Sequence, residues 1–269
     1  MESGILTCFL HQPIRLREFS FLEIGSAKPY HNSLQYQVDA LFWKERLPVL
    51  LDQFSDDFSD WLNTQRVKLA ITGFTVDWLI EWAPTTLVWL KKWQTSHQIP
   101  LCQTPYLHTS AAWLAPDLFE EAIGQSDQII KKLFPQARQS NQQADYVVNL
   151  FQKEFAHTAT PVTHLSDRLL KSGWKAVQPA MQSWSTDWHK KPVWLLNQLQ
   201  QSALEAWYSL RSMIKKKRND QISDQWHQLG AMELLFDMCT EMGSSTNAPA
   251  FERYISYMNM LGDLKQRLA

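Results

Sequence analysis

The sequence predicts an α/β protein with a parallel sheet in its first half and a helical bundle in its second half. Up to Phe134, short apolar runs alternate with longer segments of helical periodicity, which is the pattern of strands joined by helices. Beyond residue 190, apolar residues recur every two to four positions, as in packed amphipathic helices. With 269 residues, 45% of them hydrophobic, the chain is long enough to bury a sizeable core.

Three short segments of the first half are predicted strands. Residues 5–10 (ILTCFL) form an apolar, partly β-branched run that ends at the polar turn His11-Gln12-Pro13. Residues 67–72 (VKLAIT) alternate between apolar and polar and then meet a glycine, and residues 99–102 (IPLC) are a weaker third candidate. We expect these strands to be parallel, with the first of them in a central position of the sheet.

Helical patterns separate the predicted strands. They cover residues 41–58, residues 76–93 with an interruption at Pro84, and residues 116–134. The last pattern is the clearest, because Pro116 suits a first helical turn and a continuous apolar stripe follows it.

After Pro135 the sequence becomes polar and rich in glutamine (QARQSNQQ), which is typical of a linker or a loop. We expect one further helix at residues 144–155. The expected domains are an α/β part over residues 1–134, a shortened linker region over residues 135–160, and a C-terminal helical region over residues 161–269 that packs on the α/β part.

The C-terminal region contains three apolar stripes at helical spacing, which predict amphipathic helices. The chain has 13 tryptophans, and such side chains serve either as core residues or as flat platforms for sugars. Trp207 and Trp226 lie on the stripes, so we interpret both as core residues.

Charge and hydropathy exclude several classes of protein. The 26 basic and 27 acidic residues nearly balance, so no positive field favours nucleic acid or anionic lipid. Apolar runs of a few residues are far below the roughly 20 needed to cross a bilayer. The first ten residues lack a basic segment followed by a long apolar stretch, as a signal peptide would have. We therefore expect a cytoplasmic protein with no membrane segment and no nucleic-acid partner.

No motif indicates a cofactor or a metal. The 3 cysteines are widely separated, without a CxxC pair, and we interpret them as buried small apolar residues. Neither GxGxxG nor GxxxxGK[ST] occurs, and neither GxSxG nor HExxH is present. We expect no cofactor and no metal.

Candidate ligand-binding residues follow the predicted strands, because the carboxyl ends of parallel strands carry the sites of such folds. They carry hydrogen-bonding groups without a carboxylate: His11, Gln12 and Arg15 after the first strand, Thr72, Gly73 and Thr75 after the second, and Gln103, Thr104, Tyr106 and His108 after the third. The acids nearby, such as Asp77 and Asp117, fall on helical segments, where we interpret them as facing water or favouring a helix N-terminus. A single histidine such as His11 is more often structural than catalytic.

The opening ILTCFLHQPIRLREFSFLEIG resembles the first conserved region of glycoside hydrolase family 57, in its α-amylase-type branch. Further strings are similar to that family in order and spacing: VKLAITG at 67–73, TPYLHT at 104–109, the helix to Phe134, and the closing MELLFDMCT and FERYISYMNMLGDL. The resemblance implies an incomplete or rearranged (β/α) barrel-like parallel sheet, with the C-terminal helices packed on it.

The departures from the family concern catalysis. The family retains anomeric configuration, and that mechanism needs a nucleophilic carboxylate and an acid/base carboxyl about 5 Å apart. In the family, both carboxyl groups lie between the helix that corresponds to residues 116–134 and the block that corresponds to residues 160 onward. In this chain that interval is only residues 135–160, and its acids are Asp145 and Glu154. Gln103 also stands where the family has an acidic residue. We assign no catalytic residue and expect a non-catalytic member of the family.

Three functions remain open. The first is binding of α-glucan, malto-oligosaccharide or a protein partner in a remnant cleft, lined by residues that the resemblance assigns: His11, Gln12, Arg15, Tyr106, His108, Trp184 and Trp194. The second is an active retaining α-glucan hydrolase or transferase. The third is a structural or interaction protein that forms homo-oligomers, because lost barrel strands expose sheet edges that must be covered.

Overall fold

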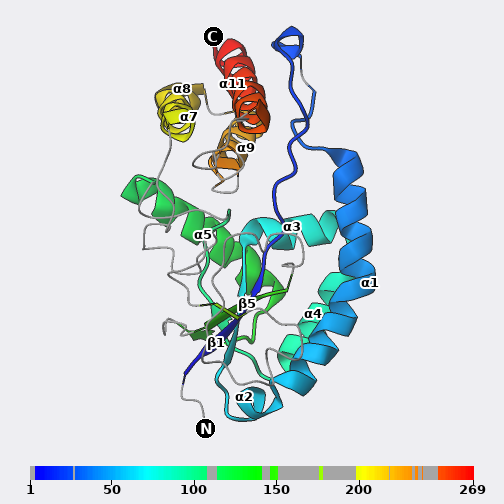
Figure 1. Ribbon diagram of the computed structural model, residues 1–269. Helices are drawn as coiled ribbons and strands as arrows, with labels where there is room; N and C mark the ends of the chain where they lie inside the picture. Colours follow the sequence, from blue (N-terminus) through cyan, green and yellow to red (C-terminus); the bar gives the residue numbers. More distant parts are fainter. Residues whose placement is uncertain are drawn as a thin grey trace. The chain divides into compact units, whose positions relative to one another are not determined.

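The chain divides into an α/β unit and a helical unit (Figure 1). A computed structural model describes residues 4–26, 28–107, 114–140, 146–150, 176–177, 198–217, 219–231, 234–235, 238 and 248–269. The first unit comprises Met1–Pro13 and Leu34–Val193, and the second comprises Ile14–Ser33 and Trp194–Ala269. The segment that follows the His11-Gln12-Pro13 turn therefore belongs to the same unit as the C-terminal helices.

The first unit is built on a parallel sheet. Its strands have the order β4-β3-β2-β1-β5-β6 and are β1 (Leu6–Leu10), β2 (Val67–Ile71), β3 (Leu101–Cys102), β4 (Gln139–Ser140), β5 (Tyr146–Asn149) and β6 (Ala176–Val177). The strands from β4 to β5 are parallel to their neighbours, and β6 runs antiparallel to β5. β1 lies between β2 and β5, and all its side chains are buried, as expected for an interior strand covered on both faces. The predicted α/β fold with a parallel sheet is confirmed, and this arrangement is compatible with the barrel-like fold implied by the resemblance.

The expected helix at residues 144–155 is wrong, because Tyr146–Asn149 forms β5. The run Tyr146-Val147-Val148 is aromatic and β-branched, which favours a strand. It pairs with the edge of β1 that β2 leaves open, with Leu6 opposite Tyr146. Gln139–Ser140, within the glutamine-rich segment, also joins the sheet as β4.

Helices in the first unit confirm the predicted alternation. They are α1 (Ser33–Asp57), α2 (Ser59–Asn63), α3 (Gly73–Trp82), α4 (Pro84–Ser96) and α5 (Pro116–Leu133). α1 begins eight residues before the predicted position 41, because its buried stripe starts at Tyr36. The break at Pro84 separates α3 from α4 as predicted. α1 runs alongside α4 in Figure 1, and the Trp93 indole N–H of α4 donates to the Ser55 hydroxyl of α1 at 2.8 Å.

The cysteines that the structure describes lie in or beside the core. Cys8 is buried in β1, and Cys102 packs against the buried cluster of Phe9, Ala70 and Phe119. Burial raises the pKa of both thiols above the ordinary value. Cys239 lies outside the described residues. Among the helices that are described, none is both long and apolar enough to cross a membrane.

The second unit joins residues 14–33 to the C-terminal helices α7 (Gln198–Ser209), α8 (Arg211–Lys217), α9 (Asp220–Leu229) and α11 (Ala248–Leu268). Asp263 of α11 is fully buried, and its carboxylate accepts hydrogen bonds from the Tyr30 hydroxyl and from the Gly25 N–H at 2.7 Å. The Arg267 guanidinium lies 3.0 Å from the same carboxylate. Burial and the hydrogen bond to Asp263 raise the pKa of Tyr30. These contacts attach the 14–33 segment to α11.

Trp207 and Trp226 form the core of the second unit, as predicted. Their rings stack with centroids 4.4 Å apart, and the side chains are 2% and 1% exposed. Each indole N–H donates to the backbone carbonyl of the other residue, at 2.7 Å from Trp207 and 3.0 Å from Trp226. Gly230 permits this packing, because a Cβ there would lie 2.5 Å from the Trp207 ring.

Trp226→Ala is expected to lower the free energy of unfolding by about 3 kcal/mol or more, because it opens a cavity beside Trp207 and removes the hydrogen bond from the Trp226 indole N–H to the Trp207 carbonyl. Urea denaturation followed by circular dichroism measures this loss. Trp89→Ala is the matched control, since that side chain is 51% exposed, and it should change stability by less than about 1 kcal/mol. Equal losses in the two variants would contradict the assignment of Trp226 to the core.

Candidate functional site

A buried polar cluster lies at the carboxyl ends of β1 and β2. It contains His11, Gln12, Thr72 and Thr75, each at most 1% exposed. The Thr72 hydroxyl lies 3.3 Å from His11 Nδ1 and 2.7 Å from the Thr75 hydroxyl, and it also caps α3 by accepting from the Thr75 N–H. The His11 ring stacks on Phe9 of β1 with centroids 5.8 Å apart. The two strand ends are therefore joined through hydroxyl groups.

Gln12 makes the most contacts of this cluster. Its backbone N–H donates to the Thr75 hydroxyl at 2.8 Å, and its side-chain Nε2 donates to Asp39 Oδ2 at 2.7 Å and to the Pro13 carbonyl at 3.0 Å. Its Oε1 accepts from the Trp43 indole N–H at 2.6 Å. A single amide thus connects the end of β1 to α3 and to two positions of α1.

Asp39 is a site residue that the sequence analysis missed. Its side chain is 3% exposed, and it accepts from Gln12 on one oxygen and from Gln35 Nε2 at 3.1 Å on the other. The buried positions Tyr36, Asp39 and Trp43 are three and four residues apart, so an acid on this apolar stripe was the available signal. The predicted helix began at residue 41 and excluded it.

The end of β3 carries the second part of the site. The Thr104 hydroxyl donates to the Ile71 carbonyl of β2 at 2.6 Å. Tyr106 is partly exposed, and its hydroxyl donates to Asp77 Oδ2 of α3 at 3.0 Å. Gly73 allows the close approach, because a Cβ there would lie 2.7 Å from the Tyr106 ring. Asp77, interpreted from sequence as a helix acid facing water or the helix N-terminus, is instead a partner of a candidate ligand-binding residue.

The predicted site residues are distributed unevenly. His11, Gln12 and Tyr106 lie in the first unit, and all three contact the beginning of α3. Thr72, the residue that caps α3, lies beside His11, and the Thr75 hydroxyl accepts from the Gln12 N–H. The Phe74 N–H donates to the Tyr106 carbonyl at 2.7 Å. Arg15 belongs to the second unit. His108, Trp184 and Trp194 lie outside the described residues.

The chemistry of the described part of this site is that of a hydrogen-bonding surface. Amide groups donate to Asp39 and the Tyr106 hydroxyl donates to Asp77, while the other contacts of the site join neutral donors to hydroxyl, carbonyl and amide oxygens. No group of three or more His, Cys, Asp or Glu side chains suited to a metal ion occurs in the part of the chain that the structure describes. Such an arrangement is suited to holding hydroxyl groups by paired donors and acceptors.

A parallel sheet with polar groups at the carboxyl ends of its strands is the architecture of α/β barrel enzymes and of their relatives. A family model, glycosyl hydrolase family 57, matches residues 7–149, which include all of β1 except Leu6, the strands β2 to β5 and the described residues of this site. The chain belongs to glycosyl hydrolase family 57. No curated protein matches the chain. No solved structure matches it either.

Gln12→Leu is expected to lower the free energy of unfolding by about 3 kcal/mol, because the shape is kept while the Trp43 N–H and the Asp39 carboxylate each lose a buried partner. Chemical denaturation measures the loss. Gln35→Leu is the control, because it removes the other amide that donates to Asp39. This amide is partly exposed, so water can replace it, and the free energy of unfolding should fall by about 1 kcal/mol or less. A Gln12 variant as stable as the Gln35 variant would refute the role of the amide.

Proposed function

We propose that this family 57 protein binds α-glucan chains, such as malto-oligosaccharides, at the carboxyl edge of its sheet without hydrolysing them. The observation that carries the proposal is the Gln12–Asp39 contact. A buried carboxylate that accepts hydrogen bonds from two amides cannot reach an anomeric carbon or a glycosidic oxygen. Asp39 therefore supports the site as a fixed acceptor.

Hydrolysis with retention needs two carboxyl groups that reach the same sugar. Among the described residues, three carboxylates accept hydrogen bonds from candidate ligand-binding residues: Asp39 from Gln12, Asp77 from Tyr106 and Asp127 from Gln103. Asp39 is buried, whereas Asp77 and Asp127 are partly exposed. Asp127 is also held by the Lys131 ammonium at 3.3 Å, which suits binding of sugar hydroxyls better than a double displacement. The acids of the shortened interval, Asp145 and Glu154, lie outside the described residues.

Tyr106 and Asp77 are the described groups that best suit a sugar. The Tyr106 ring is partly exposed and is fixed edge-on against Phe74, with centroids 6.3 Å apart. Its hydroxyl donates to the Asp77 carboxylate, and carboxylate oxygens are acceptors of the kind that sugar hydroxyls need. An aromatic face beside a carboxylate is a common arrangement in sites that bind the apolar face and the hydroxyl groups of a sugar. The ligand contacts expected from sequence at Arg15, His108, Trp184 and Trp194 stay predictions.

The purified protein is expected to release no reducing sugar from soluble starch, maltodextrin or pullulan between pH 4 and 9. The physical reason is that the described carboxylates of the site are engaged by its own polar side chains, Asp39 by Gln12 and Asp77 by Tyr106. A reducing-sugar assay with long incubation measures it. Activity that disappears in Asp77→Asn or Asp39→Asn would overturn the proposal and favour the alternative, an active retaining α-glucan hydrolase or transferase.

Maltoheptaose is expected to quench tryptophan fluorescence with a dissociation constant of about 1 mM, as for a few sugar contacts that must offset lost ligand freedom. Tyr106→Phe should weaken this binding severalfold, because Asp77 loses the hydroxyl that orients it. Tyr254→Phe is the control, since it removes a hydroxyl that pairs with Ser202 in the second unit. Unchanged fluorescence and melting temperature with several α-glucans would remove sugar binding from the proposal.

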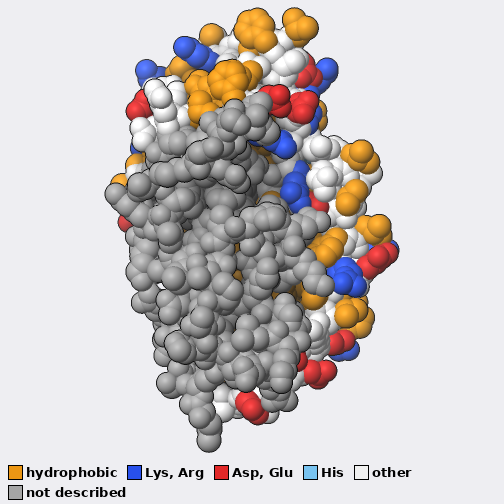
Figure 2. Space-filling view, viewed as in Figure 1, with side chains coloured by type: hydrophobic (Ala, Val, Ile, Leu, Met, Phe, Trp, Pro, Cys, Tyr) orange, Lys and Arg blue, Asp and Glu red, His pale blue; other side chains and the backbone are white. Residues whose placement is uncertain are grey.

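Self-association, the third function considered from sequence, is a second candidate that one observation favours. The helix α1 exposes the large apolar side chains of Leu34, Val38, Leu41 and Val49, whose spacing places them on one face. Figure 2 shows hydrophobic side chains interspersed with charged ones along the right edge, where α1 lies. Light scattering over a range of concentrations distinguishes a monomer from an oligomer.

A further inference from the structure

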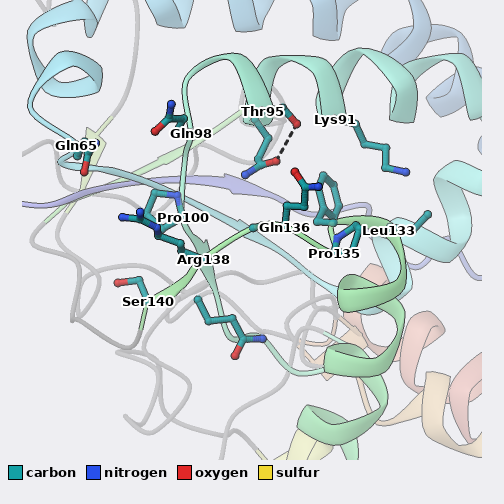
Figure 3. Close-up of a pocket in the computed structure, with 14 residues that line it drawn as sticks. Gln65, Lys91, Thr95, Gln98, Pro100, Leu133, Pro135, Gln136, Arg138 and Ser140 are labelled. Atoms are coloured by element: carbon teal, nitrogen blue, oxygen red, sulfur yellow. Dashed lines mark hydrogen bonds between the residues drawn. The ribbon is translucent and has the colours of Figure 1, made fainter.

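A second concave site lies at the opposite edge of the sheet, at the amino ends of β2, β3 and β4. The cavity has a volume of about 930 Å³, at the upper end of the range for small-molecule sites. α4 and the segment that follows α5 supply most of its lining, and Figure 3 shows Lys91 and Thr95 on α4 with Arg138 and Ser140 on the other side of the cavity. All lining residues belong to the first unit.

The lining of this cavity is cationic. Lys91 and Arg138 are its charged residues, and no lining residue is acidic. The carboxyl ends of α4 and α5 lie near the cavity, and each contributes about half a negative charge within its last turn. Two full positive charges outweigh these two partial charges, so the cavity favours an anionic group. The Arg138 backbone is fixed, because its carbonyl accepts from the Leu101 N–H of β3 at 2.8 Å.

The remaining polar groups of the cavity are mostly amides. Five glutamines line it, namely Gln65, Gln94, Gln98, Gln136 and Gln139, together with the hydroxyls of Thr95 and Ser140. The Gln94 amide is used within the protein, because its Nε2 donates to the Ile99 carbonyl at 2.7 Å and its Oε1 accepts from the Thr95 hydroxyl at 3.4 Å. The amides of the other four glutamines can both donate and accept, which matches the hydroxyl groups of a saccharide. Phe134 is the lining aromatic residue and is buried, so it offers no exposed ring on which a nucleobase would stack.

Two of these glutamines adopt a backbone conformation that glycine usually occupies. Gln65 and Gln98 have φ of +54° and +50°, and among the described residues they are the non-glycine residues with positive φ. Each follows a helix, α2 or α4, at a position where glycine is the common terminator. A long side chain at such a position costs stability, so its presence at two positions around one cavity points to a role of the side chains.

From these observations we propose that the cavity binds a phosphorylated saccharide. Arg138 holds the phosphate, Lys91 adds positive charge on the other side of the cavity, and the glutamine amides, Gln65 and Gln98 among them, hold the sugar hydroxyls. Pro100, Leu133 and Pro135 offer apolar surface to the C–H face of the sugar. The inference does not rest on the α-glucan binding proposed above, because the two sites lie at opposite edges of the sheet and share no residue.

Isothermal titration calorimetry of the full chain at low salt with glucose 6-phosphate tests the proposal. We expect binding at least about tenfold tighter than that of glucose, weakening as salt is raised, because screening reduces the attraction of the phosphate. Arg138→Gln should weaken binding fivefold or more. Lys132→Gln is the control, since this exposed lysine neighbours the lining without belonging to it, and it should change the affinity less than twofold.

Gln98→Gly separates a binding role from a structural one. Glycine adopts the positive φ without cost, so the melting temperature should be unchanged or higher, while glucose 6-phosphate binding weakens. Tyr106→Phe should leave this binding intact, which distinguishes failure of this inference from failure of the α-glucan proposal. Absence of binding, equal effects of Arg138→Gln and Lys132→Gln, or affinity for inorganic phosphate or ADP equal to that for glucose 6-phosphate would overturn the proposal.

Discussion

The first unit depends on one buried amide. Gln12 lies in the turn that follows β1. Its side chain donates to the Asp39 carboxylate and accepts from the Trp43 indole N–H, both on α1, and its backbone N–H donates to the Thr75 hydroxyl of α3. Each of these groups is buried, and an unpaired one costs about 1–3 kcal/mol. The orientation of α1 and α3 against the sheet is therefore coupled to the conformation of the chain immediately after β1. The same amide belongs to the buried polar cluster of the candidate site, so stability and site geometry depend on one set of contacts.

The second unit depends on a buried charge, the Asp263 carboxylate of α11. Asp263 loses hydration in the helical core, and such a carboxylate is tolerated only when it is fully bonded. Tyr30 and Gly25 supply donors from the 14–33 segment, and Arg267 supplies the opposite charge from the next turn of α11. The 14–33 segment also has contacts of its own, since the Arg17 N–H donates to the Tyr30 carbonyl at 2.9 Å and the Asn32 N–H donates to the Arg15 carbonyl at 2.7 Å. Its attachment to α11 in turn supplies the donors that the buried Asp263 carboxylate requires.

The sequence predicted those parts of the fold that local pattern determines. Apolar runs ending in polar turns marked β1 and β2, and the proline at 84 marked the boundary between α3 and α4. The contact between Gln12 and Asp39 was not predictable in this way, since it joins residues 27 positions apart and depends on the register of a helix that begins earlier than its clearest periodicity. β5 was mistaken for a helix because a short β-branched run becomes a strand only when an open sheet edge meets it.

The carboxyl and amino edges of the sheet differ in the charges that they present to a ligand. At the carboxyl edge, the side chains of His11 and Gln12 make hydrogen bonds within the protein, so the groups around Tyr106 and Asp77 are the main ligand contacts. The Asp77 carboxylate repels anions. At the amino edge, Arg138 and Lys91 have no acidic residue beside them in the lining, and amides replace carboxylates. A neutral glucan suits the carboxyl edge, and a phosphorylated sugar suits the amino edge. Both ligands present the same kind of hydroxyl groups, but Coulomb attraction to the cations acts only on the phosphate. In the two proposals, charge rather than hydrogen-bonding capacity therefore distinguishes the saccharide at one edge from the saccharide at the other.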